Sequence, residues 1–218
     1  MNEKVILVHG YLRTYRDMVD LKGNLEKLGY GIILVDLPLT FSNIERAANI
    51  FEKKVNQVIN NLEIGEKINL VGHSTGGLII RLFLSNTLYI DKIHRCVLVA
   101  TPNKGCQLAD IASEVFKTFT RISKTLKSLK CDEVEKLKLT NEKQADIGVI
   151  AGNKSNLFLG KLLGSCNDGR IEINSALYEN AKDYIILPLN HKEIHRDLQV
   201  AKYIDRFLQY GNFNNTNT

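Results

Sequence analysis

The sequence predicts a single-domain α/β fold with about six mostly parallel strands and helices on both faces of the sheet. Short runs rich in valine and isoleucine recur along the 218 residues, and the intervals between them place apolar residues at helical spacing. The runs are continuously apolar rather than alternating, which is typical of parallel strands covered on both faces. A chain of this length fits one compact domain.

Six runs are expected to form the strands: residues 5–8, 32–35, 68–71, 96–100, 147–151 and 184–187. A first helix is expected between Thr14 and Gly29 and a second between Ser42 and Gly65, because each segment carries an apolar face. The core-facing positions expected in the first helix are Met18, Leu21, Leu25 and Leu28. A third helix must begin directly after Ser74, since no loop separates it from the third strand.

Residues 104–139 hold no strand-like run and predict a short helical insertion after the fourth strand. Within residues 108–129, apolar side chains recur three or four apart, with three lysines and one arginine between them. Such a segment can pack over the sheet or the site. It can also make a peripheral contact with a membrane as a basic amphipathic helix. Both interpretations stay open at this point.

The last helix is expected to run through His195 to about Gly211, so that residues 1–211 form the domain and 212–218 a polar, disordered tail.

The first apolar run is too short for a signal-peptide core or a membrane span, so a cytoplasmic location is expected. The net charge of +5 comes from scattered lysines, so no nucleic-acid partner is expected. The four cysteines lack C-x-x-C spacing and are expected to be reduced thiols.

Ser74 is the candidate nucleophile. It lies in the segment Gly-His-Ser-Thr-Gly at residues 72–76, between the third strand and the helix that follows. A serine hydroxyl is a weak nucleophile at neutral pH and must be held where a base can take its proton. A tight strand-to-helix turn presents it in this way, and glycines at 72 and 76 let neighbouring backbone approach closely.

The backbone N–H groups of Thr75 and Tyr11 are the candidate oxyanion hole. Thr75 opens the third helix, whose N-terminus adds partial positive charge where negative charge develops on a carbonyl oxygen. Tyr11 lies in the loop after the first strand, at the same carboxyl edge of the sheet. This chemistry requires no metal and no organic cofactor, and none is expected.

His191 is the candidate general base. Ligands bind at the carboxyl ends of strands in an open parallel sheet, and only His191 and His195 follow the last strand. The other histidines point elsewhere, lie beside the oxyanion loop or lie at the opposite edge: His73, His9 and His94. His191 lies directly after the strand, so it is better placed to reach Ser74. His195 falls inside the predicted last helix and either contacts His191 or lies on the helix surface.

Asp168 is the candidate acid that orients His191. It lies in the turn-forming segment 167–170, between the fifth and sixth strands. Other aspartates precede their strands, lie on the far side of the sheet or fall in the insertion: Asp146, Asp183, Asp36, Asp110 and Asp132. The alternative is that Asp168 and Gly169 form only a turn.

These motifs resemble those of the α/β-hydrolase superfamily, in particular its compact bacterial lipases and esterases. The resemblance includes Val-His-Gly at residues 8–10, Ala-Thr-Pro-Asn-Lys-Gly at 100–105 and Asn-His at 190–191, and it spans nearly the whole chain. It implies an α/β-hydrolase fold, with Ser74, Asp168 and His191 as a triad and the Tyr11 and Thr75 amides as the oxyanion hole. Because the first strand begins near residue 5 and the insertion is short, it also implies a fairly open site.

The expected activity is hydrolysis of carboxylic esters through an acyl-enzyme intermediate on Ser74. The expected substrate is a small-molecule or lipid ester. The same residues would serve an acyl thioesterase or a phospholipase, because substrate choice depends on the pocket rather than on the fold. A non-catalytic scaffold that keeps the pocket for ligand binding is an alternative of another class.

Overall fold

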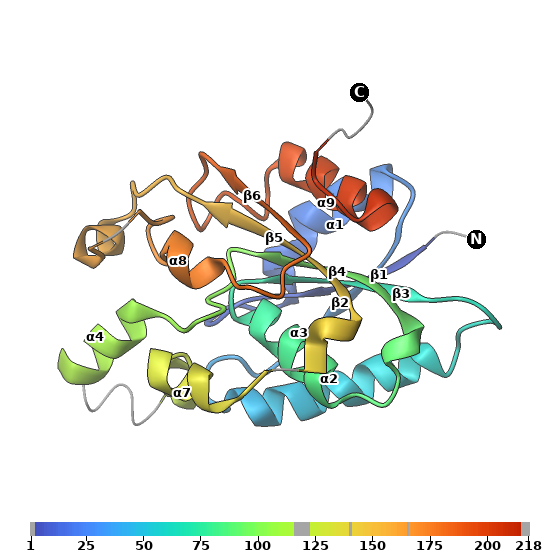
Figure 1. Cartoon of the computed structure of the whole chain (residues 1–218), viewed down its shortest axis with the longest axis horizontal. Helices are drawn as coiled ribbons and strands as arrows, with labels where there is room; N and C mark the ends of the chain where they lie inside the picture. Colours follow the sequence, from blue (N-terminus) through green and yellow to red (C-terminus); the bar gives the residue numbers. More distant parts are fainter. Residues whose placement is uncertain (1–2, 116–122, 140, 165, 215–218) are drawn as a thin grey trace.

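A computed structural model of the chain describes residues 3–115, 123–139, 141–164 and 166–214. Its centre is one sheet of six strands in the order β2-β1-β3-β4-β5-β6, and every neighbouring pair is parallel (Figure 1). The strands are β1 (Lys4–Val8), β2 (Gly31–Val35), β3 (Ile68–His73), β4 (Ile93–Val99), β5 (Asp146–Gly152) and β6 (Asp183–Leu187). The predicted fold class is confirmed.

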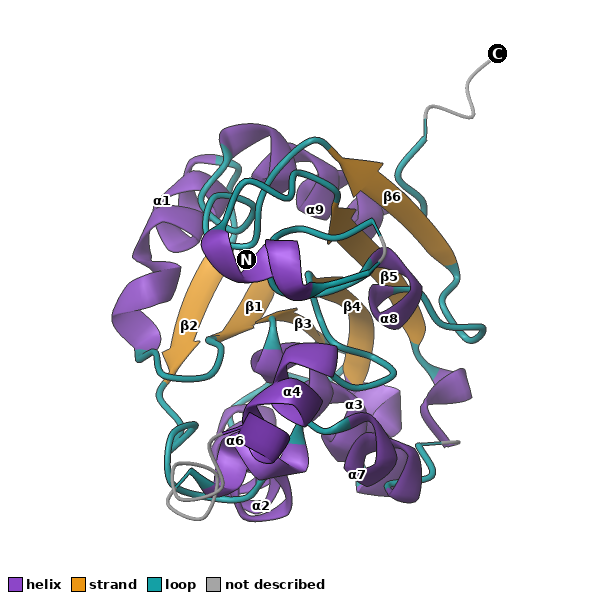
Figure 2. Cartoon of the chain, turned by 90° about the vertical axis from the view of Figure 1, so that its left-hand side faces the viewer, coloured by secondary structure: helices purple, strands orange, loops and turns teal. Residues whose placement is uncertain are grey.

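Helices cover both faces of this sheet (Figure 2). Helices α1 (Val19–Lys27) and α9 (Leu198–Tyr210) pack on one face with Val5 and Leu7 of β1. Helices α2 (Ile44–Ile59) and α3 (Thr75–Asn86) pack on the other face with Ile6 and Val8. Successive side chains of a strand point to opposite faces, so both faces need apolar residues and the run becomes continuous.

The order of the strands places the candidate site. The chain passes from β1 outward to β2, and then returns to place β3 on the other side of β1. The loops that follow β1 and β3 therefore diverge at their carboxyl ends and leave a crevice at this switch point. Tyr11 follows β1 and Ser74 follows β3, so both residues lie at this crevice.

The described part of the predicted insertion is helical and contains no named strand. It comprises α4 (Gln107–Val115), α6 (Lys124–Ser128) and α7 (Cys131–Lys136). Ala109 and Leu129 are buried in one apolar cluster with Leu78 of α3. The expected basic amphipathic stretch falls partly on residues 116–122, which lie outside the described residues. Its contact with a membrane stays a prediction.

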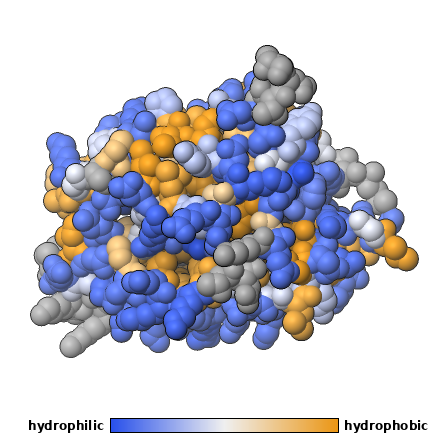
Figure 3. All heavy atoms as spheres, in the orientation of Figure 1, coloured by the Kyte–Doolittle hydropathy of each residue, from blue (hydrophilic) through white to orange (hydrophobic). Residues whose placement is uncertain are grey.

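Shorter elements complete the chain. They are α8 (Ile173–Ala176) and the 3-10 helices η1 (Tyr15–Met18), η2 (Ile90–Lys92), η3 (Asn141–Gln144) and η4 (Phe158–Leu162). Among the residues that the structure describes, no helix combines the length and the apolar character needed to cross a bilayer. The surface is largely hydrophilic on the face in Figure 3, and apolar atoms gather in the upper part of that view.

The predicted start of the last helix is wrong. The helix begins at Leu198 rather than before His195, because the Asp197 side chain accepts hydrogen bonds from the N–H groups of Gln199 and Val200 and so caps the helix. His195 lies in the turn before the helix and is buried. The interpretation of His195 as a residue on the helix surface is therefore wrong.

Two smaller predictions about packing are also corrected. Leu28, expected in the core, is 38% exposed because α1 ends at Lys27 and the chain turns at Gly29, whose φ is +97°. Phe213, expected in a disordered tail, is buried and packs on Phe207 with their ring centroids 5.0 Å apart. Phe213 follows the end of α9 so closely that its ring can still pack on the core beside Phe207. Residues 215–218 lie outside the described residues.

Candidate active site

Ser74 occupies a tight turn between β3 and α3. Its φ is +53°, a conformation that a residue with a side chain rarely adopts, and its N–H donates a 2.9 Å hydrogen bond to the carbonyl of Val99. A β-carbon at position 72 would lie 2.6 Å from the nitrogen of Gly77, and one at position 76 would overlap the carbonyl of Val8. Glycine is therefore required at both positions, and the predicted strand-to-helix turn is confirmed.

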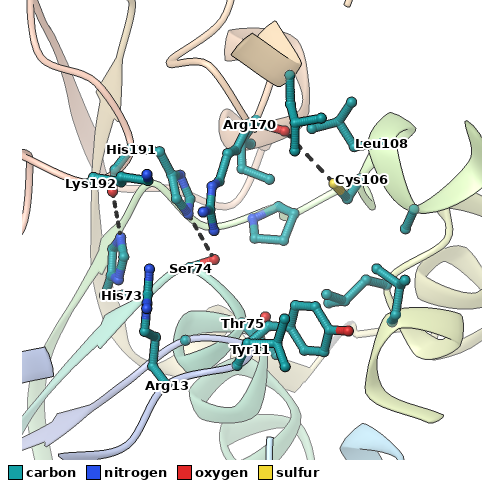
Figure 4. Close-up of a pocket in the computed structure, with 18 of the residues that line it drawn as sticks. Tyr11, Arg13, His73, Ser74, Thr75, Cys106, Leu108, Arg170, His191 and Lys192 are labelled. Carbon is teal, nitrogen blue, oxygen red and sulfur yellow. Dashed lines mark hydrogen bonds between the residues drawn. The ribbon is translucent and has the colours of Figure 1, made fainter. Parts of the chain in front are cut away.

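A chain of hydrogen bonds runs from Ser74 to the interior of the protein. Ser74 Oγ lies 3.1 Å from His191 Nε2 (Figure 4), and His191 Nδ1 lies 2.7 Å from Asp168 Oδ2. A carboxylate only accepts, so the imidazole proton lies on Nδ1 and the lone pair of Nε2 faces the serine hydroxyl. His191 and Asp168 are 3% and 1% exposed. The three residues expected to form a triad are thus brought together, although 117 positions separate Ser74 from His191.

The loop around Asp168 fixes the position of its carboxylate. Asp168 Oδ1 accepts the backbone N–H groups of Arg170 at 2.9 Å and Ile171 at 2.7 Å. The N–H of His191 in turn donates to the backbone carbonyl of Asp168 at 2.9 Å. The turn at Gly169, with φ of +91°, is present as well. The segment is therefore both a turn and the support of His191, because the same loop holds the carboxylate against the imidazole.

The expected oxyanion residues face the same cavity as Ser74. Tyr11 and Thr75 both line it, and Thr75 is the first residue of α3, where the N–H groups have no acceptor within the helix. The loop of Tyr11 is held by buried His9, whose Nε2 accepts the N–H of Leu37 at 3.0 Å and whose Nδ1 donates to the carbonyl of Gly10 at 2.9 Å. The Tyr11 hydroxyl lies 2.7 Å from Ser123 Oγ at the start of α6.

A second carboxylate–imidazole pair lies beside the first and was not found from the sequence. Asp17 Oδ2 lies 3.2 Å from Nε2 of His195, and the ring of His195 stacks on His73 with centroids 3.8 Å apart. His73 Nε2 donates to the carbonyl of His191 at 3.2 Å. Asp17 follows β1 in the sequence and so lies at the carboxyl edge of the sheet. The rule that selected Asp168, that candidate residues follow the strands, would therefore have indicated Asp17 as well.

His73 remains neutral in this cluster. Burial lowers its pKa well below the ordinary value, and the neighbouring His195 and His191 lower it further. Because the carbonyl of His191 accepts from Nε2, the single proton of the neutral ring lies there. His73 therefore supports the backbone that carries the candidate base, which the sequence did not indicate.

The cluster of Asp17, His73 and His195 also has the composition of a metal site. One possible ligand atom from each residue lies within 4.8 Å of the others. An imidazole binds a metal through a nitrogen lone pair in the plane of its ring, at about 2.0–2.1 Å for zinc. The rings of His73 and His195 are stacked with an interplanar angle of 23°, so their lone pairs run side by side instead of meeting at one point. The arrangement does not fit a metal bound by both rings.

A cavity of about 420 Å³ opens beside Ser74. One part of its wall is apolar and comes mainly from the insertion and the segment after Arg170: Leu108, Ala109, Ala112, Leu126, Leu129 and Ile171. The rest includes four cations: Arg13, Arg170, Lys192 and Arg196. Cys106 also lines the cavity, but burial raises the pKa of its thiol to about 11. The thiol is therefore protonated near neutral pH, which leaves Ser74 as the better placed candidate nucleophile.

The chain belongs to the alpha/beta hydrolase fold family, whose model matches residues 4–169. The matched segment contains Ser74 and Asp168 and ends before His191. A comparison with curated protein sequences finds no match.

Solved structures of bacterial and metagenomic hydrolases share this fold. The mature lipase BlEst2 of Bacillus licheniformis is 19% identical, with 96% of this chain and 92% of that chain covered and a TM-score of 0.79. The metagenomic carboxyl esterase MGS0156 is 18% identical over 95% of this chain and 76% of that chain, with a TM-score of 0.75. The phospholipase PlaB of Legionella pneumophila is 18% identical over 97% and 60%, with a TM-score of 0.78. At these identities the likeness shows the fold.

Proposed function

We propose that this protein is a serine hydrolase that cleaves carboxylic esters. The observation that carries the proposal is the continuous hydrogen-bond chain from Asp168 through His191 to Ser74, which ends at a cavity with an apolar wall. The serine lies on a strained turn at the start of a helix, where an activated nucleophile is presented to its substrate. The named activities of the lipase and esterase with the same fold support this class of reaction.

In the proposed reaction Ser74 Oγ attacks the ester carbonyl while His191 Nε2 accepts the hydroxyl proton. Asp168 keeps the proton of His191 on Nδ1 and stabilises the imidazolium. The N–H groups of Tyr11 and Thr75 receive the charge that develops on the carbonyl oxygen. His191 then protonates the leaving alcohol, and the same residue activates the water that releases the acid from the acyl-enzyme.

The substitution Ser74→Ala tests the proposal directly. Turnover of a panel of p-nitrophenyl esters should fall by about a thousandfold or more, because the nucleophile is removed while the pocket remains. Labelling by a fluorophosphonate probe should be lost with it. The matched control is Ser128→Ala, which removes a serine hydroxyl of α6 that does not line the cavity and should leave both readouts unchanged.

The same panel separates the alternatives. Undiminished turnover in Ser74→Ala would remove this serine from the mechanism. A wild-type protein that neither reacts with the probe nor turns over any ester would be a non-catalytic binding scaffold. Matched thioesters and phospholipids, assayed beside the esters, distinguish a thioesterase or phospholipase from a carboxylesterase, because all of these would use the same three residues.

A further inference from the structure

The cavity beside Ser74 carries more positive than negative charge. Among its described lining residues Asp17 is the single carboxylate, against four cations. Asp17 is already engaged, since its Oδ1 lies 2.7 Å from Nη2 of Arg196 and its Oδ2 lies 3.8 Å from Nε of Arg13. Within the described part of the chain, the side chains of Arg170 and Lys192 have no ion pair and no hydrogen bond. The cavity lining therefore carries an excess of positive charge.

Arg170 lies near the expected chemistry. Its backbone N–H is fixed by Asp168, and its partly buried side chain extends toward the space beside Ser74 (Figure 4). Arg13 extends toward the same space from the opposite side. Burial lowers the pKa of the Arg170 guanidinium and the charge of Arg13 lowers it further, whereas the carboxylates of Asp168 and Asp17 act in the opposite direction. A guanidinium still remains charged at neutral pH.

The free energy of this arrangement favours an anionic ligand. A partly buried cation without a partner loses hydration and gains no ion pair. A carboxylate or phosphate between two guanidinium groups would supply that partner through charge-assisted hydrogen bonds. The two sides of the cavity place a second requirement on the ligand. Leu108 and Cys106 lie on one side of Ser74, and Lys192 lies on the other (Figure 4). An ester whose carbonyl lies at Ser74 extends both ways, toward the apolar wall and toward the cations.

We propose that Arg170, together with Arg13, binds an anionic group of the substrate, so that the protein prefers esters with one apolar part and one carboxylate or phosphate. This inference rests on the proposed ester hydrolase activity and names the substrate class of that site. The anionic group lies in the acyl part if it is a carboxylate of a dicarboxylic monoester. It lies in the alcohol part if it is a phosphate of an acylated glycerol phosphate.

Two pairs of substrates test the preference and distinguish these sources. The first pair is the nitrophenyl monoester of adipic acid and nitrophenyl hexanoate, which have acyl chains of equal length. The second pair is a monoacylglycerol phosphate and the corresponding monoacylglycerol. In at least one pair the wild-type kcat/KM should favour the anionic member by about tenfold or more. Added salt should reduce this ratio, because it screens charges that are open to solvent.

Variants of the two arginines assign the preference to this site. Arg170→Gln should bring the ratio of the responding pair close to one, Arg13→Gln should reduce it, and Arg170→Lys should keep part of it. The control is Arg206→Gln, which removes one positive charge from α9 outside the cavity and should leave the ratio unchanged. Retained fluorophosphonate labelling shows that each variant is folded. A wild-type ratio near one in both pairs, or a ratio insensitive to Arg170→Gln, overturns the proposal.

A binding measurement separates this inference from the proposed function. The Ser74→Ala protein should bind the adipic monoester in calorimetric titration, and Ser74→Ala with Arg170→Gln should bind it at least about tenfold more weakly. Binding that depends on Arg170, in a protein whose wild type hydrolyses no ester, would support the anion site and contradict the hydrolase. Hydrolysis of esters without any Arg170-dependent preference or binding would support the hydrolase and contradict the anion site.

Discussion

Two carboxylate–imidazole pairs lie side by side at the carboxyl edge of this sheet, and they differ in what the imidazole faces. In the first pair His191 contacts Asp168 with one nitrogen and Ser74 Oγ with the other. In the second pair His195 contacts Asp17, and its ring stacks on the ring of His73. The same two residue types therefore form a candidate catalytic base in one place and a packed support in the other. What distinguishes the first pair is the Ser74 hydroxyl, which lies on a strained turn and faces His191.

The two carboxylates are also held by different groups. Asp168 accepts two backbone N–H groups of its own loop in addition to His191. Asp17 is paired mainly with side chains, and the closest cation, Arg196, is half-exposed. Backbone donors have no charge that titrates, whereas exposed side-chain pairs contribute less and are screened by salt. We therefore expect the first pair to govern activity and the second to govern stability.

The largest expected contrast is between the two imidazoles. His191→Ala should lower kcat for p-nitrophenyl esters by about ten thousandfold or more, because the proposed general base is removed. His195→Ala should cost less than about tenfold, because its ring pairs with Asp17 and stacks on His73 rather than contacting Ser74 Oγ. Steady-state kinetics of both variants measure the contrast. Losses of similar size in the two variants would make the second pair part of the catalytic machinery.

A smaller contrast is expected between the two carboxylates. Asp168→Asn should lower kcat by about a thousandfold to ten thousandfold, because an amide no longer fixes the proton of His191 on Nδ1. Asp17→Asn should change kcat by only a few fold. The KM of the ester separates a positioning effect from a binding effect in both variants. A full kcat in Asp168→Asn would restore the alternative that this segment is only a turn.

The strained backbone of Ser74 belongs to the first region alone. Ser74→Gly should be more stable to urea than Ser74→Ala by about 1–2 kcal/mol, because glycine adopts a φ of +53° without a steric clash. The control is Ser85 in the last turn of α3, where alanine should be the more stable substitution because glycine has the lower helix propensity. Equal stabilities of the two variants at position 74 would show that the turn stores no strain.

The smallest expected effect is the contribution of Asp17 to stability in acid. Burial alone raises its pKa, but pairing with His195 and Arg196 outweighs this and leaves the pKa well below its ordinary value. A carboxyl whose folded pKa is depressed stabilises the protein above its unfolded pKa, near pH 4, and loses this contribution as the pH falls through the folded pKa. Asp17→Asn should therefore lower the free energy of unfolding at pH 7 by about 1 kcal/mol, with the difference shrinking below pH 4.

Urea unfolding of wild type and Asp17→Asn at several pH values measures this contribution. Exposed Asp20 supplies the control, since Asp20→Asn removes a neighbouring carboxylate that lies 3.8 Å from Arg196 and should have little effect. A stability difference that is the same at pH 7 and pH 3 would assign the role of Asp17 to packing rather than to charge.

The strands were predictable because a buried parallel strand must be apolar on both faces, and Val5 to Val8 of β1 show this plainly. The meeting of Ser74, Asp168 and His191 was predictable for a related reason, since loops after parallel strands gather at one edge. The start of α9 was mispredicted because apolar spacing alone does not locate a cap, and the Asp197 side chain ends the turn that holds His195. Burial of Phe213 against Phe207 depends on a return of the chain that no local pattern encodes.

The sequence by itself therefore determined the fold class and the set of residues at the carboxyl edge, because strand periodicity and chain order are local properties. Only the tertiary structure revealed that a second pair, Asp17 and His195, lies beside the first, and that Arg13 and Arg170 extend toward the same cavity. Those outcomes depend on the directions of side chains from segments far apart in the sequence. Packing sets these directions, and it does so only after the sheet and its loops are assembled.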